Sequence, residues 1–156
     1  MKKTHQFILF TFVLLLFITS LSVSASAADN ASPQIQRFED GSYAVVTIDT
    51  EQPLDEIAFA AGKQIISGTK NYSYYNGSNV LVLVFRVHGT FEYDGMTSSA
   101  VGASYSYDIY DNNWSFLDGN ATCSNATATA TGSFMRFLVP KSVTVSLTCS
   151  PNGVLS

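Results

Sequence analysis

The chain has 156 residues, of which only 13% are charged, and its formal net charge is −4. Its few basic residues form no cluster, and an acidic chain without one is poorly suited to bind nucleic acid or an anionic membrane surface. The length corresponds to one domain that is large enough to bury a core of its own.

The first 28 residues have the order of a secretory signal peptide. Lys2 and Lys3 form a basic start, an apolar run follows over residues 7–18, and small residues close the segment. A retained anchor is the alternative, but the apolar run is too short to cross about 30 Å of hydrocarbon at about 1.5 Å per residue. We therefore predict cleavage after Ala27 or Ala28, a secreted, extracellular product and no membrane contact afterwards. Six basic against twelve acidic residues then leave a net charge near −6.

Polar residues dominate the segment that follows. Residues 29–42 predict a flexible lead-in before a single domain at residues 43–156, in which the first strand is expected at residues 43–48. Residues 53–66 are ambiguous. A stripe of apolar residues after Pro53 fits a short helix, whereas Gly62 favours a loop that leads into a strand.

The rest of the chain alternates apolar and polar residues, as β-strands do. Strands are expected at residues 69–75, 80–93 and 101–109, from Trp114 onward, and at residues 126–138 and 143–149. Asn76 and Gly77 predict a hairpin turn, because both tolerate positive φ. About seven strands joined by short turns favour an antiparallel β-sandwich of immunoglobulin-like architecture. The low charge and the many Ser and Thr residues predict outer faces covered by hydroxyl groups.

Cys123 and Cys149 are the two cysteines, and in an exported chain an even count favours one disulfide. Cys149 is in phase with the apolar face of the last strand, whereas Cys123 points inward only if the chain bulges near Gly119. A reactive thiol pair is disfavoured, because the spacing is not C-x-x-C and no basic residue is near. We predict the bridge, with two free thiols as the alternative.

Five segments from Ser67 onward share a Ser/Thr/Tyr-rich character: SGTKNYSYYN, GTFEYDG, SYSYDIYDNNWSF, ATATATGSF and VTVSLTCSPNGVLS. They resemble a group of small exported β-rich proteins of Gram-positive bacteria. Because that group has no assigned activity, the resemblance implies a bacterial, exported, β-rich product and transfers no functional residue. It also makes the six N-x-S/T triplets a by-product of composition rather than glycosylation sites. These triplets begin at Asn30, Asn71, Asn76, Asn113, Asn120 and Asn125.

Catalytic chemistry has little support in the sequence. The mature chain has one histidine, His88, on the same strand face as Glu92 and Asp94. Successive residues on one face of a strand are about 6.6–7 Å apart, too far for direct hydrogen bonds along the strand. No nucleophile or zinc-binding motif is present. A solvated sheet face is the preferred interpretation, and a small hydrolase that uses His88 with Glu92 or Asp94 is the third function hypothesis.

A cluster of Asp108, Asp111, Asn113 and Asp118 offers oxygen ligands of the kind that Ca²⁺ prefers. Its spacing does not match the helix-loop-helix calcium signature, and Asp and Asn are good turn formers in their own right. We therefore predict a polar hairpin turn here, with no metal and no cofactor.

Aromatic side chains provide the candidate ligand-binding residues Tyr72, Tyr74, Tyr110 and Trp114, since such rings stack on sugars while Asn and Asp bind hydroxyl groups. The preferred hypothesis is a secreted, non-enzymatic β-sandwich that acts by surface interaction at the cell envelope. Its candidate partners are a cell-wall glycan, a host glycan or a protein. The alternative is a carbohydrate or small-ligand binding module.

Overall fold

The computed structural model describes residues 32–51 and 62–156, which form eight strands and contain no helix able to span a membrane. The strands are β1 (Gln34–Arg37), β2 (Tyr43–Glu51), β3 (Gln64–Tyr75), β4 (Leu81–Tyr93), β5 (Ser98–Ile109), β6 (Trp114–Ser124), β7 (Thr127–Arg136) and β8 (Val139–Thr148). The predicted signal peptide lies outside the described residues. So does most of the ambiguous segment, of which residues 64–66 belong to β3.

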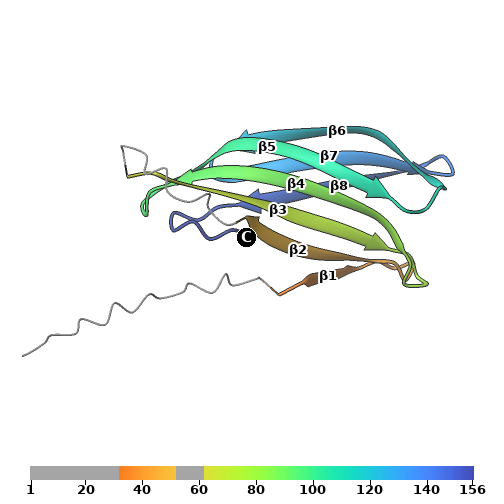
Figure 1. The fold of residues 1–156 in the computed structure, drawn as a ribbon. Helices are drawn as coiled ribbons and strands as arrows, with labels where there is room; N and C mark the ends of the chain where they lie inside the picture. Colours follow the sequence, from red (N-terminus) through yellow and green to blue (C-terminus); the bar gives the residue numbers. More distant parts are fainter. Residues whose placement is uncertain (1–31, 52–61) are drawn as a thin grey trace, which may run out of the picture.

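The strands form two packed antiparallel sheets (Figure 1). One sheet has the order β1-β2-β3-β4-β5 and the other the order β6-β7-β8. The smaller sheet covers β3, β4 and β5. The all-β antiparallel sandwich is thereby confirmed. The immunoglobulin-like architecture is not, because within each sheet the described strands pair only with their neighbours in sequence, whereas the immunoglobulin fold uses Greek-key connections.

Strand β1 lies inside the segment expected to be a flexible lead-in. It pairs with β2 from Gln34 opposite Val46 to Arg37 opposite Tyr43. All four residues of β1 are exposed, so no apolar alternation marks this strand in the sequence. Backbone hydrogen bonding to β2, rather than burial, makes it part of the sheet.

Alternation places one face of each sheet in a shared core. From β4, Phe85 is fully buried, and it meets Phe134 of β7 edge to face with ring centroids 5.8 Å apart. This is a favoured geometry for aromatic pairs and joins the two sheets at their centre. Glycine makes room for the rings, since a Cβ added at Gly132 would lie 2.7 Å from the Phe85 ring. Gly119 stands opposite Gly132 on β6, so the sheet is thinned across both strands.

The predicted disulfide is absent, and both cysteines are free. The expected bulge is present between Phe116 and Asp118 and places Cys123 opposite the buried Ala128, but Cys123 itself is exposed on the edge strand β6. Cys149, however, follows β8, and β7 separates β8 from β6. Two strand spacings are about 10 Å, beyond the Cα separation of about 7 Å that a disulfide can bridge. Burial raises the pKa of the Cys149 thiol.

Candidate functional site

The β1–β2, β3–β4, β5–β6 and β7–β8 turns all lie at one end of the sandwich (Figure 1). We call this end, formed by residues 38–42, 76–80, 110–113 and 137–138, the turn end. A pocket of about 140 Å³ opens there. It is lined by residues of the turns and the adjoining strands, namely Asp40, Ser42, Tyr74, Asn76, Gly77, Val82, Asp111, Trp114 and Arg136.

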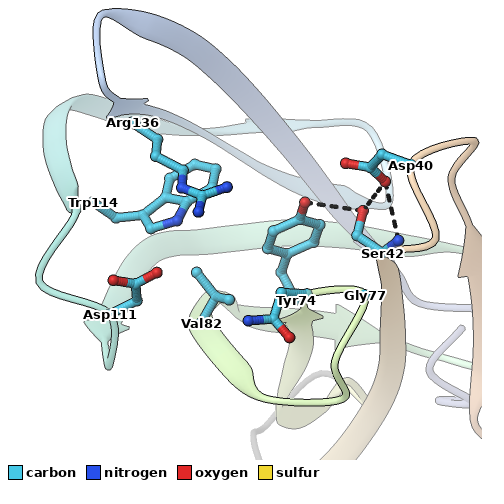
Figure 2. A pocket seen from close by; sticks show the side chains of 9 residues that line it. Asp40, Ser42, Tyr74, Gly77, Val82, Asp111, Trp114 and Arg136 are labelled. Atoms are coloured by element: carbon cyan, nitrogen blue, oxygen red, sulfur yellow. Dashed lines mark hydrogen bonds between the residues drawn. The ribbon is translucent and has the colours of Figure 1, made fainter.

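A chain of hydrogen bonds fixes one wall of the pocket (Figure 2). The Tyr74 hydroxyl donates to Ser42 Oγ at 2.9 Å, and the Ser42 hydroxyl donates to Asp40 Oδ1. The Ser42 amide donates to the same carboxylate oxygen at 3.0 Å. These bonds from Ser42 lower the pKa of Asp40, with a smaller contribution from the charge of Lys141. The wall therefore presents an anionic acceptor at neutral pH.

The opposite wall carries Trp114, Arg136 and Asp111. Trp114 meets the Tyr74 ring edge-on, with centroids 5.8 Å apart. It also stands opposite Arg136 in the register of β6 and β7. Within the described residues, Arg136 forms no salt bridge. Figure 2 shows Asp40 and Asp111 on opposite sides of the pocket, with the Trp114 and Arg136 side chains above Asp111.

This arrangement suits a small hydroxylated ligand. The Trp114 ring offers apolar surface, the two carboxylates accept hydrogen bonds, and the guanidinium donates them. The Tyr74 ring is only 6% exposed, so it supports Trp114 and Ser42 rather than presenting its face to a ligand. Pockets that enclose drug-sized ligands measure about 300–1,000 Å³, so this pocket is the size for one sugar residue or a group of similar bulk.

Two of the four predicted ligand-binding residues meet in the pocket, Tyr74 and Trp114. Tyr72 is buried like Tyr74 but does not line the pocket; it is 8% exposed, and burial raises the pKa of its phenol to about 12. Tyr110 is 56% exposed at the turn end but does not line the pocket. The structure therefore excludes Tyr72 and Tyr110 from the pocket, whereas the sequence could not distinguish them from Tyr74 and Trp114.

Sequence reasoning missed Asp40, Ser42 and Arg136. The first two lie in the segment assigned to the lead-in, although Asp40 followed by Gly41 is a common turn signal. Gly41 does adopt a positive φ of 80°. Arg136 carries no local signal, because its role depends on the turns that surround it in the fold.

His88 lies on the outer face of the five-stranded sheet, between two hydroxyl groups. Its Nδ1 is 2.8 Å from Thr69 Oγ1, and its Nε2 is 2.8 Å from Ser106 Oγ. A shallow hollow of about 320 Å³ beside the ring is lined mainly by hydroxyl-bearing residues and glycines. Both ring nitrogens are thus engaged within the sheet.

The partners considered for a hydrolase are engaged elsewhere. Glu92 forms a salt bridge to Lys63 at 2.9 Å. Asp94 accepts two hydrogen bonds from backbone amides of its own turn, the shorter from Thr97 at 2.6 Å. The structure does not assemble either residue with His88 into a proton-transfer pair.

The acidic residues considered for calcium are likewise held in pairs and turns. Asp108 forms a salt bridge to Arg86 at 2.7 Å. Asp111 accepts a hydrogen bond from the Asn113 side chain at 2.7 Å, and Asp118 accepts one from the next amide at 2.8 Å. No cluster of three metal-ligating side chains occurs in residues 32–51 and 62–156.

Hydroxyl groups cover the outer face of the three-stranded sheet. Along β7 and β8 they pair across the strands at three successive positions, with oxygen separations of 3.0, 3.0 and 3.4 Å. The pairs are Thr127 with Thr148, Thr129 with Ser146, and Thr131 with Thr144. This row is neutral and polar, as the composition predicts.

No protein-family model, curated protein or solved structure matches this chain.

Proposed function

We propose that the protein is exported and acts by surface interaction at the cell envelope, without catalysis, and that it binds carbohydrate in the pocket at the turn end. One observation carries this proposal. Two aromatic rings, two carboxylates and a guanidinium without an ion-pair partner among the described residues share one small pocket. The Trp114 ring suits the apolar face of a sugar, the carboxylates suit its hydroxyl donors, and the guanidinium suits its hydroxyl acceptors.

Binding is favoured over hydrolysis by the arrangement of the titratable groups. The carboxylates of Asp40 and Asp111 both accept hydrogen bonds from their own turns. The His88 ring lies on the outer face of the larger sheet, bonded to Thr69 and Ser106. The bonds to Asp40 and Asp111 engage Oδ1 of each carboxylate and leave Oδ2 as an acceptor for a ligand hydroxyl. A general acid or base must reach the substrate within hydrogen-bonding distance, and the His88 ring does not line the pocket.

The test is a binding screen of the secreted protein on a glycan array that includes cell-wall fragments, followed by calorimetry with any ligand found. Trp114→Leu removes the indole and is expected to abolish binding, whereas Trp114→Phe keeps a ring and part of the affinity. Tyr110→Leu is the matched control, because this ring is exposed beside the pocket without lining it.

Thermal melts of all three variants establish that they are folded. Binding by Trp114→Leu with unchanged affinity would place the carbohydrate elsewhere, and the absence of any ligand on the array would contradict the proposal as a whole.

A further inference from the structure

The turn between β7 and β8 has a backbone conformation that its residues disfavour, and it exposes apolar side chains to solvent. Arg136 stands opposite Val139, which leaves Phe137 and Leu138 as a two-residue hairpin loop. Their φ angles are 46° and 69°. Positive φ at both positions is the signature of a type I′ turn, which strongly prefers Asn and Gly. Bulky apolar residues are outliers in this conformation.

The same sheet contains a hairpin loop built in the ordinary way. The β6–β7 turn also has two residues, and there the positive φ falls on Asn125, a residue that tolerates it. The unusual choice of residues is therefore specific to the β7–β8 turn. Backbone strain of this kind is commonly retained where it positions a functional group.

The β7–β8 turn also carries three consecutive exposed apolar residues, which we call the apolar tip. Phe137 is 69% exposed, Leu138 88% and Val139 66%. Two neighbouring turns at the same end add Val80 and Tyr110, which are 55% and 56% exposed. Figure 1 shows the β7–β8 turn projecting at the end of the sandwich, so the apolar tip is a protrusion rather than part of a groove.

We propose that the apolar tip inserts into a lipid bilayer. A projecting wedge of apolar side chains needs a partner that deforms around it, as the interfacial region of a bilayer does. The Arg136 guanidinium lies 5.3 Å from the centroid of the Phe137 ring, and Arg136 is the last residue of β7 before the tip. A long cationic side chain in that position reaches the level of lipid phosphates while the apolar residues lie deeper.

This inference goes beyond the proposed function and revises one expectation from the sequence. The acidic net charge argues against attraction to an anionic surface, but insertion by apolar contact requires no such attraction. Tyr110, with an apolar ring and a polar hydroxyl, suits the interface beside the inserted residues. Because Arg136 both lines the pocket and precedes the tip, insertion would hold the pocket against the membrane surface.

The test measures flotation of the secreted protein with phosphatidylcholine vesicles. Wild-type protein is expected to float with the vesicles, and to do so equally at high salt, because the contact is apolar. The double variant F137N/L138G gives the turn its preferred residues and removes the two apolar side chains. Its partition coefficient is expected to fall by at least about tenfold. Met96→Asn is the matched control, since Met96 is 85% exposed at the opposite end of the sandwich.

Three results would overturn the proposal. The first is that the wild-type protein stays in the aqueous fraction at millimolar lipid. The second is that a folded F137N/L138G variant floats with the vesicles as well as the wild type does. The third is concentration-dependent dimerisation of the wild type without lipid that the double variant abolishes, because the apolar tip would then bind a second copy. Carbohydrate binding is measured on the same variants without vesicles, so a failure here is distinct from a failure of the pocket proposal.

Discussion

Replacing the turn residues Phe137 and Leu138 by Asn and Gly should stabilise the fold, although it removes two large apolar side chains. Each L-residue with left-handed φ costs about 1–2 kcal/mol. Glycine at position 138 relieves this cost fully and asparagine at position 137 relieves it in part. Two losses oppose the gain: the flexibility of glycine in the unfolded chain, about 0.5–1 kcal/mol, and the Arg136–Phe137 contact, about 0.5–1 kcal/mol.

The balance is a stabilisation of about 1 kcal/mol, which raises the Tm of a domain this size by about 4 °C. Thermal unfolding followed by far-ultraviolet circular dichroism measures the shift, with Met96→Asn as a surface control of unchanged Tm. A lower Tm for F137N/L138G would mean that the Phe137 and Leu138 side chains pack in solution and that the turn is not strained. The explanation of the apolar tip as a feature kept at a cost in stability would then be refuted.

Three further outcomes are expected. Gly132→Ala should destabilise the fold by about 1–3 kcal/mol in urea unfolding, because its Cβ would overlap an aromatic ring, whereas Gly102→Ala, with its nearest neighbour at 3.4 Å, should be close to neutral. A thiol reagent should label one cysteine of the native protein, the exposed Cys123, and reach the buried Cys149 only after denaturation; two protected thiols under non-reducing conditions would indicate a disulfide. Hydrogen bonds from backbone amides lower the pKa of Asp94, so its contribution is complete above the unfolded pKa of about 3.9 and is lost as the pH falls through the lower folded value. Unfolding free energies between about pH 2 and 5 should therefore drop less steeply in Asp94→Asn than in the wild type.

The strands were predictable because most of them alternate between inward and outward residues, although β4 is buried on both faces from Val82 to Phe85. Along β4, alternation from Leu83 to Phe91 matches the inward face of the sheet, and the expected span of residues 80–93 agrees closely with Leu81–Tyr93. Strand β1 shows the limit of this signal. Its residues are all exposed, so only pairing with β2, which depends on the whole sheet, defines it.

Turn positions were easier to predict than turn conformations. The hairpin at Asn76 is present, but the positive φ falls on Asn79 rather than on Gly77. Asn76 instead uses its side-chain oxygen to accept hydrogen bonds from the amides of Ser78 and Val80, at 3.0 Å each. A side chain that replaces a backbone acceptor allows a longer loop than the two-residue turn expected from the dipeptide alone.

The disulfide prediction failed because the alternation of inward and outward residues does not show which strands are neighbours. Parity with the bulge near Gly119 puts Cys123 in register with the inward-facing Ala128, but only Cys149 is buried and Cys123 is exposed. Parity does not give strand order, however, and β7 lies between the strands that carry Cys123 and Cys149. Two cysteines with the same inward phase can therefore lie on strands that are too far apart for a disulfide.

The position of the site follows from topology more than from any motif. Each strand pairs with the next within its sheet, and the turn from β5 to β6 passes between the sheets. Because the chain reverses direction at every turn, alternate turns fall at the same end, so the turns near residues 40, 78, 111 and 137 converge whatever their sequences. Two aromatic residues of the pocket were recognisable by type. The charged residues Asp40 and Arg136, in contrast, are separated in sequence by nearly the whole domain. Convergence also explains why the apolar tip adjoins the pocket, since Arg136 ends the strand that leads into it. A chain with the same residues but a Greek-key connection between the sheets would redistribute these turns between the two ends and disassemble both features at once.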